Sequence, residues 1–572
     1  MNMNNETFQQ ADPLQPSEKK SPKVSKTVWY IGCGCLALIA LCVVIALGVF
    51  GWMYFFGSKD PIAAVVPNSS LVYMSVDFLQ SQSEKFNEIV PIFQGIADVE
   101  KRPLADALDE AMRDELNLSF KDEVVPWMGQ HGGFAITEGD VNSGDVKVMF
   151  IMETRNKKLT DDFLPKFVAA LENARDIKFE KKEVDGNALY VYKSEYQPRD
   201  DMVVARSGSL VYLSNSEDTV LQSINLKSSD SLANSSKYKD ALAALPKNSM
   251  TTIYVNGDNI SNYLSSISNN FNSPSVDQFA DNSVSALALS ASVEDAGMRF
   301  DIAATYDPTK VNDFQKESLN AKFLNPKADS LAPENTFFFL DVNNTQSPST
   351  LAQKDNPMYT QDVQEALDLF EKQYGVSITK LLELLGGEYA LAIGPSNDGP
   401  FNTLGEVDLG ATLFASTTNE AGANDWFKSG LSAASKEMGM ELVTNQVTLG
   451  GYQLQEVTSR GLDGQLFLYG TVNGYMVIGS SKDLLESGLS GKNTLANNTT
   501  YRDTWKAFPS GSVPYLYLNI TNLIDFYKNT PGGTFGNAEA DLRKIPVIAA
   551  TMNNNGGYTR AATVIVFINT QK

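Results

Sequence analysis

The chain has 572 residues, of which 43% are hydrophobic and 10% aromatic, so it can bury hydrophobic cores and is long enough for more than one domain. It carries 46 Lys and Arg against 68 Asp and Glu, a formal net charge of −22. Because nucleic acids and anionic lipid headgroups are bound through clustered Lys and Arg, this balance argues against nucleic acid as a partner. The simpler role of the excess acid is solubility.

The first 27 residues are polar and contain three prolines, and they carry four lysines against three acidic residues. A segment of this composition cannot bury enough apolar surface to fold. Residues 1–27 are therefore predicted to be a disordered tail.

An apolar run follows, from Val28 to Phe56, with 29 residues and no charge. About 20 apolar residues cross a bilayer core, so residues 28–57 are predicted to form a transmembrane helix. Aromatic residues stand at both ends, as in interfacial belts: Trp29, Tyr30, Trp52 and Tyr54. The four lysines before the run, against only Lys59 soon after it, place the N-terminus in the cytoplasm and the body outside it.

A cleaved signal peptide is the alternative, but its apolar core is about 7 to 15 residues long and ends in a small-x-small site. A lipoprotein signal is disfavoured because Leu41 precedes Cys42. All of the cysteines lie inside the run, at Cys33, Cys35 and Cys42. The body therefore has no zinc finger, redox CxxC site or cysteine nucleophile.

The body opens with PNSSLVYMSVDFL from Pro67, which predicts a turn followed by a strand, since Pro, Asn and Ser favour turns and aromatic and β-branched residues favour strands. Similar phrases begin at Pro246, Pro333 and Pro509. Asp77 in the first phrase is a candidate acid, but the residues aligned with it are Asn256, Asp341 and Asn519. This mixture suits the end of a strand better than a catalyst.

Residues 132–153 then read as strand, polar loop and strand, a predicted hairpin, and residues 388–417 repeat the pattern. Residues 159–174 predict a helix, because Phe163, Phe167, Val168 and Leu171 share one helical face. Residues 214–224 and 480–489 each place Ser or Asn before an apolar-periodic run, as helix N-caps do.

The body is an internal duplication. YKDALAALPKNS from Tyr238 matches YRDTWKAFPSGS from Tyr501, and six such pairs occur in one order at offsets of 257 to 266 residues. The sequence therefore predicts two homologous lobes, 61–325 and 326–572. Strands outnumber helices without regular βαβ alternation, so the fold class is α+β, with each lobe an antiparallel sheet and packed helices.

Catalytic signals are weak. His131, the sole histidine, could act as a general base, but Glu388 stands at the corresponding place in the second lobe. The glycines after His131 predict a turn at the entry to a hairpin. No G-x-S-x-G or nucleotide motif is present, and Gly386 with Gly387 is too short for phosphate binding.

The stretch 140–145 resembles a calcium loop but lacks the required ligands, and it is predicted to be a solvated hairpin loop. No catalytic, cofactor-binding or metal-binding residue is therefore assigned. A pair of Asp or Glu residues far apart in the sequence stays open, because such a pair leaves no local spacing to read. Several aromatic residues could line a glycan groove but are more often core: Tyr190, Tyr192, Trp426 and Tyr452.

The basic tail, the single span with cysteines and the Pro-x-x-Ser phrase before an aromatic strand, as at Pro67, together resemble a family of membrane-anchored bacterial proteins of unknown function. The resemblance covers most of the chain, implies a cell-envelope location and implies no activity. We expect a non-catalytic envelope protein that binds a protein or an envelope ligand, with a cleft between the duplicated lobes as the default site. The alternative is an extracytoplasmic Asp/Glu-dependent hydrolase acting on a glycan or peptide.

Overall fold

The structure is a computed structural model, and it describes residues 60–77, 80–97, 99–140, 145–195, 201–258, 283–323, 325–343, 361–401, 407–460, 464–530, 533–554 and 557–569. The predicted tail and the predicted span 28–57 lie outside these residues, as does most of the loop 140–145. None of the helices within the described ranges has the length and apolar character needed to cross a bilayer. The membrane span therefore stays a prediction.

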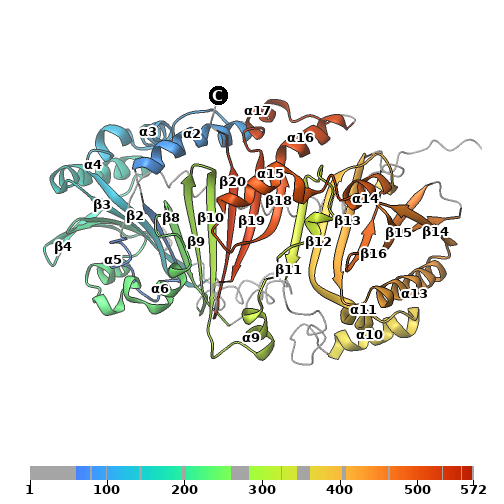
Figure 1. The fold of residues 1–572 in the computed structure, drawn as a ribbon. Coiled ribbons are helices and arrows are strands. Elements are labelled where there is room, and N and C mark those ends of the chain that lie inside the picture. The colour runs from blue at the N-terminus through green and yellow to red at the C-terminus, as the bar shows by residue number, and fades with distance from the viewer. Residues whose placement is uncertain are drawn as a thin grey trace, which may run out of the picture. The chain divides into compact units, whose positions relative to one another are not determined.

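The described strands form one antiparallel sheet (Figure 1). The first half of the chain supplies, in spatial order, β4 (Glu180–Val184), β5 (Asn187–Tyr192), β6 (Met202–Ser207), β7 (Leu210–Ser214), β3 (Asp145–Thr154), β2 (Met128–Asp140), β1 (Val72–Asp77), β8 (Thr251–Asn256), β9 (Val284–Glu294) and β10 (Gly297–Tyr306).

The second half continues from β10 with its own strands in the reverse spatial order. These are β20 (Thr559–Phe567), β19 (Val547–Asn554), β18 (Val513–Asn519), β11 (Phe338–Asn343), β12 (Leu385–Pro395), β13 (Leu409–Thr417), β17 (Tyr475–Gly479), β16 (Gln465–Val472), β15 (Tyr452–Ser459) and β14 (Leu442–Leu449). Each strand of one half thus has a counterpart in the other, and the order reads alike from both ends.

The α+β fold with antiparallel pairing is confirmed, but the sequence did not predict that the two halves share one sheet. Strand β10 pairs with β20, and Ile302 lies opposite Ala562, 260 residues later. An antiparallel pair of equivalent strands is related by a twofold axis, so equivalent residues face each other at its centre. The junction is therefore a pseudo-twofold built into the sheet.

The helices cap and cover this sheet. Their bounds are α2 (Gln80–Ile96), α3 (Leu104–Leu116), α4 (Lys157–Arg175), α5 (Glu217–Ile224), α6 (Ser236–Ala243), α9 (Asp313–Asn320), α10 (Gln361–Tyr374), α11 (Ile378–Leu384), α13 (Glu420–Met438), α14 (Lys482–Leu489), α15 (Thr499–Thr504), α16 (Ile520–Asn529) and α17 (Glu539–Leu542).

The predicted helix 159–174 is confirmed as α4, with Phe163, Val168 and Leu171 buried. The predicted N-caps are confirmed as well. The Ser216 side chain accepts a hydrogen bond from the Thr219 N–H, and the Ser481 side chain accepts one from the Leu484 N–H. Each cap satisfies a backbone donor that the first turn of a helix leaves unpaired.

Each half has its own aromatic core beneath the repeated Pro phrases. In the first half Tyr238 of α6 stands edge-on to Tyr73 and Tyr254, with ring centroids 6.1 and 5.2 Å away. In the second half Tyr501 of α15 stands edge-on to Phe339 and Tyr517, at 6.3 and 5.0 Å. The four phrases therefore supply paired strands whose aromatic residues hold one helix of each half.

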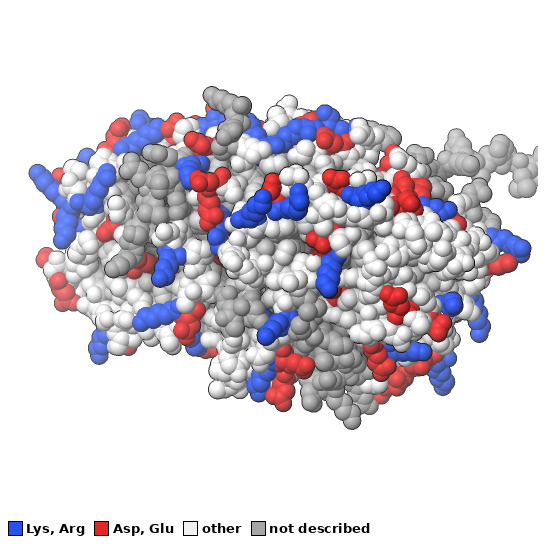
Figure 2. Space-filling view, in the orientation of Figure 1, with Lys and Arg blue, Asp and Glu red and all other residues white. Residues whose placement is uncertain are grey.

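Contacts across the junction include polar ones. The Thr563 hydroxyl on β20 donates a hydrogen bond of 2.7 Å to the buried Asp301 carboxylate on β10. The same carboxylate forms an ion pair with Arg299 at 2.8 Å. Outside the sheet, Lys101 pairs with the buried Asp541 at 2.5 Å, across 440 residues of sequence. On the face drawn in Figure 2, Lys and Arg are interspersed with Asp and Glu.

Gly297 begins β10 at the junction with a φ of +137°, and a Cβ there would lie 2.1 Å from the Val566 carbonyl oxygen on β20. We expect Gly297→Ala to lower the free energy of unfolding by about 2 kcal/mol or more, through backbone strain and the clash. Urea unfolding followed by circular dichroism measures it. Gly557→Ala is the matched control, because Gly557 has a φ of +59° with no atom near its missing Cβ. Its expected cost is about 1 kcal/mol, and equal costs would contradict the tight approach at Gly297.

Candidate functional site

Three acidic side chains from distant parts of the sequence gather in the second half. Asp341 lies on β11, Glu388 on β12, and Asp329 in the short 3-10 turn Ala328–Ser330. Phe339, Asp341 and Asn343 alternate along β11 and are all buried, so they share the face of the sheet that carries the aromatic core. Buried carboxyl groups are rare unless paired, which marks this cluster for attention.

Glu388 is fixed by three donors. Its Oε1 accepts hydrogen bonds from the backbone N–H groups of Lys327 and Ala328, both at 2.8 Å. Its Oε2 accepts a hydrogen bond of 2.5 Å from the Tyr475 hydroxyl on β17. The carboxylate therefore anchors the segment that joins the two halves and is itself held in one orientation.

Asp341 is buried without such support. Its side chain is 1% exposed, and among the described residues neither carboxyl oxygen has a hydrogen-bond partner of good geometry. Burial raises the pKa of Asp341 to about 8, and the neighbouring charges of Glu388 and Asp329 add to the rise. Asp341 is therefore largely protonated at neutral pH, because the apolar surroundings and the nearby acids both disfavour its charged form.

Asp329 is affected in the same direction but less strongly. Burial raises its pKa to about 6, with Glu388 as the second cause, while the Ser330 backbone and the Tyr501 hydroxyl partly offset the rise. Burial and Glu388 also raise the pKa of Tyr475. The cluster thus combines one well-hydrogen-bonded carboxylate, Glu388, with two acids whose pKa values are raised by burial, and of these two Asp341 alone is mostly protonated at neutral pH.

A cavity of about 450 Å³ opens beside this cluster. Its lining residues come from the segment that joins the two halves, from β12 and β13, and from the start of β17 with the turn before it: Asn325, Lys327, Glu388, Ser416, Asn473, Gly474 and Tyr475. Asp341 is not among the lining residues. Glu388 and Tyr475 are therefore the members of this cluster that line the cavity, although each is largely buried.

The corresponding place in the first half holds different chemistry. His131 occupies the position of Glu388, and its Nδ1 lies 2.6 Å from the Glu153 Oε2 on β3. The His131 Nε2 is buried with no partner among the described residues. The prediction that His131 is a turn residue is wrong: it lies inside β2, because β1 on one side and β3 on the other draw the glycine-rich stretch into the sheet.

The register also corrects one alignment. Asp77 lies opposite His131, and Asn343 lies opposite Glu388, so the counterpart of Asp77 is Asn343 and not Asp341. Asp341 instead occupies the position of Ser75. The acid at 341 is therefore a feature of the second half alone, which sequence alignment of the short phrases had hidden.

Gly386 has a packing role. A Cβ there would lie 2.4 Å from the Ser416 Oγ, and a Cβ at Gly129, its counterpart in the first half, would lie 2.8 Å from the Glu153 Cβ. Both glycines let β2 or β12 approach its neighbouring strand closely where the polar residues gather.

The aromatic residues considered for a glycan groove have separate local roles. Trp426 donates its indole N–H to the Ser377 carbonyl at 2.8 Å, and Tyr190 lies under the Lys181 ammonium at 5.7 Å. Within the described ranges, no group of three or more His, Cys, Asp or Glu side chains is arranged to hold a metal ion.

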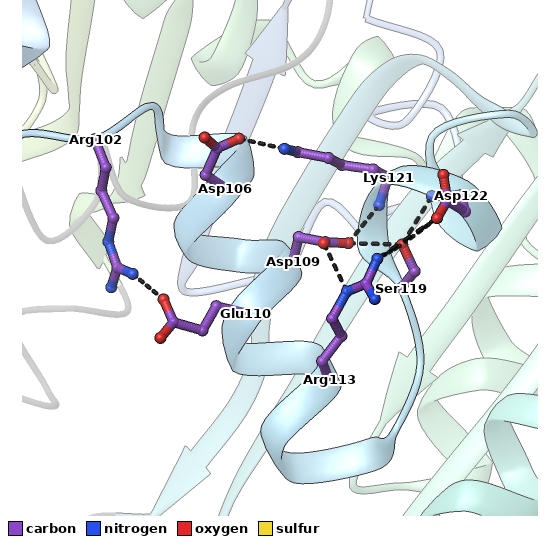
Figure 3. Close-up of polar contacts among 8 residues, drawn as sticks. All are labelled: Arg102, Asp106, Asp109, Glu110, Arg113, Ser119, Lys121 and Asp122. Carbon is purple, nitrogen blue, oxygen red and sulfur yellow. Dashed lines mark hydrogen bonds and ion pairs between the residues drawn. The ribbon is translucent and has the colours of Figure 1, made fainter.

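A second polar cluster, drawn in Figure 3, closes the end of α3. Asp109 accepts hydrogen bonds from the Lys121 N–H, the Ser119 hydroxyl and the Arg113 guanidinium, at 3.0, 2.7 and 2.8 Å. These donors lower the pKa of Asp109, the Lys121 N–H most of all. Because its charge is compensated locally, we assign this cluster to holding the turn after α3.

Comparisons with known proteins give a family and no activity. A family model described as "Protein of unknown function (DUF3352)" matches residues 36–567. No curated protein matches the chain. Among solved structures, crystal form III of TP0453 is 12% identical with a TM-score of 0.23, over 47% of this chain and 90% of that chain. Crystal form I of TP0453 is 13% identical with a TM-score of 0.22, over 47% and 88%. Likeness at this level supports no statement about function.

The buried acid makes a pH dependence that can be measured. The pKa of Asp341 is about 8 in the folded chain and about 3.9 when unfolded, so its stabilising contribution is complete below about pH 4 and is lost as the pH rises to 8. From this proton we expect stability to fall by about 1.4 kcal/mol per pH unit near pH 6 and by about half as much per unit at pH 8, and Asp341→Asn to remove that slope.

Urea unfolding at pH 6, 7 and 8 provides the measurement. Asp503→Asn is the control, because Lys506 lowers the pKa of Asp503 and its charge does not change in this range. A slope that is the same in Asp341→Asn and in the parent chain would show that Asp341 is ionised.

Proposed function

Because the chain belongs to the DUF3352 family, whose function is unknown, we propose its function from its own residues: it is a membrane-anchored protein of the cell envelope that binds a small polar ligand without transforming it. The observation that carries this proposal is the cavity of about 450 Å³ beside the fixed Glu388 carboxylate. A cavity of that size suits a small molecule, and a few well-placed polar groups supply orientation.

The ligand that fits best carries a protonated amine. Glu388 lines the cavity and accepts three hydrogen bonds, and since a carboxylate has about four lone-pair sites it can accept at most one further donor. A cationic donor makes the stronger bond. The Lys327 side chain and the Asn473 amide, also in the lining, suit hydroxyl or carboxyl groups on the same molecule. An amino sugar or an amino acid meets both requirements.

The hydrolase is the second candidate, and one observation favours it. Asp341 keeps its proton near neutral pH beside the hydrogen-bonded Glu388, and two acids in unlike environments are the usual acid and base of glycoside hydrolysis. Against it, Asp341 is 1% exposed and does not line the cavity. An acid that cannot reach a leaving group cannot protonate it, so binding is the better supported function.

The envelope location rests on the sequence. The uncharged run Val28–Phe56 is long enough to span a bilayer, and the lysines before it favour a cytoplasmic N-terminus. The interspersed charges in Figure 2 and the net charge of −22 disfavour nucleic acid, which needs clustered cations. The proposed partners are therefore the membrane, through one span, and an envelope ligand or protein.

The membrane topology is tested by fusing a reporter enzyme that is active only outside the cytoplasm after residue 60. We expect activity from that fusion, and none from the same fusion lacking 28–56, because the run supplies both the signal and the anchor. Extraction of the intact chain with carbonate should leave it in the membrane fraction. A fusion that is active only in the cytoplasm, or a chain that carbonate releases, would refute the anchored arrangement.

Ligand binding is tested by calorimetry with pairs of molecules that differ in one amine, glucosamine against glucose and alanine against lactate. We expect the amines to bind at least tenfold more tightly, about 1.4 kcal/mol, and Glu388→Gln to abolish the difference by removing the charge. His131→Gln is the matched control at the same place in the first half. Equal binding of each pair, or an unaffected Glu388→Gln variant, would end the amine proposal. If the chain hydrolyses a glycan or a peptide, and Asp341→Asn abolishes that activity, then the hydrolase is the correct function and the binding proposal fails.

A further inference from the structure

The two ends of the sheet are strands β4 and β14, which hold corresponding places in the two halves. Among the described strands, β4 pairs only with β5, and β14 pairs only with β15. Each therefore presents one row of backbone N–H and C=O groups that no strand of the described ranges pairs with. Edges of this kind invite pairing with another chain, and proteins protect them with charge, brevity or proline.

The first edge is protected. Strand β4 has five residues with the sequence EKKEV. Lys182 pairs with Glu217 at 3.0 Å and Lys181 lies over the Tyr190 ring, so the cations are held at the edge. A strand docking here would have to strip water from several charges, which is costly.

The second edge has none of these devices. Strand β14 has eight residues with the sequence LVTNQVTL, without a charge or a proline, and residues 443–446 are exposed. Among these residues is the hydrophobic Val443, which is 39% exposed. The duplication placed the same strand at both ends of the sheet, and only one of the two copies was left able to accept a neighbour.

The hairpin geometry shows which groups of β14 face outward. Leu449 and Tyr452 flank the two-residue turn Gly450–Gly451, whose φ angles of +57° and +89° are those of a type I′ turn. The residues flanking such a turn exchange hydrogen bonds, and bonded and non-bonded pairs then alternate along the ladder. Thr444, Gln446 and Thr448 consequently direct their N–H and C=O groups away from β15 and toward the free side.

We propose that β14 pairs antiparallel with β14 of a second copy of this chain, with Asn445 opposite its own counterpart. A twofold axis perpendicular to a sheet requires some residue to face itself. In this register Val443 lies opposite Val447 of the copy, on one face, and no charged residues of the two strands oppose each other. The exposed Val443 is then covered by the copy. The backbone groups of Thr444 on one strand exchange hydrogen bonds with those of Gln446 on the other.

The choice of a second copy follows from what this sheet already does. Its two halves join edge to edge, antiparallel, about a pseudo-twofold at β10 and β20, so equivalent strands of this sheet pair in that way. The uncharged β14 also avoids the repulsion that a net charge of −22 imposes on most other faces of two like molecules.

Disulfide trapping in the full-length chain, reconstituted in lipid nanodiscs or kept in membranes, tests the pairing. The native cysteines are replaced by Cys33→Ala, Cys35→Ala and Cys42→Ala, and Asn445→Cys then supplies the sole thiol. In a non-hydrogen-bonded antiparallel pair the Cα atoms are about 4.5 Å apart, within disulfide reach. We expect mild oxidation to give a dimer that reductant reverses. Glu180→Cys on β4, the position equivalent to Asn445, is the matched control and should stay monomeric.

A second variant separates pairing from chance collision. Val443→Lys adds a cation to an exposed side chain, so the fold should tolerate it, and it should lower Asn445→Cys cross-linking at least tenfold and reduce the dimer seen by mass photometry. The proposal is overturned if Asn445→Cys cross-links no better than Glu180→Cys, if Val443→Lys leaves the dimer intact, or if Asn445→Cys is captured by a different protein instead of its copy.

Discussion

The pairing of β10 with β20 is the constraint on which the rest of the structure depends. Either half alone would leave a strand of nine or ten residues with unpaired backbone groups at the edge of its sheet, open to pairing with another chain. Joined about the pseudo-twofold, the two strands satisfy each other over nine residue pairs. The junction is therefore a continuous part of the sheet, and opening it would break a full ladder of hydrogen bonds. The described cavity is lined by the segment that joins the halves and by residues of the second half.

Within the shared sheet, the two halves differ mainly in the polar residues that lie next to the aromatic cores. Tyr238 donates to Asp60 in the first half, and Tyr501 lies beside Asp329 in the second, so the pair of phenol and acid was kept. Asp60 also accepts from the Tyr73 hydroxyl and two backbone N–H groups, whereas Phe339 in the second half offers no hydroxyl. There Asp341 and Glu388 are present instead. The two halves therefore share the packing of the aromatic core and differ in the polar residues next to it.

The features set by local chemistry could be predicted from the sequence. Pro, Asn and Ser before an aromatic run indicated the four turn–strand units, and Ser216 and Ser481 indicated two helix starts, because caps and turns are decided by neighbours in the chain. The strand at His131 was missed because its glycines favour turns and only the flanking strands override them. The union of β10 with β20 and the gathering of residues 329, 341 and 388 depend on pairings across long stretches of sequence, for which no local pattern exists.

The duplication also supplies an internal comparison that bears on the acids. The first half builds the same strands, the same register and an equivalent aromatic core with Ser75 and His131 where the second half has Asp341 and Glu388. The fold therefore does not need these acids. Burying Asp341 among other carboxyl groups opposes its ionisation and costs stability at high pH. Asp341 thus opposes the stability of a fold that does not need it, and it stands beside the Glu388 cavity; proteins tolerate such conflicts chiefly at functional sites.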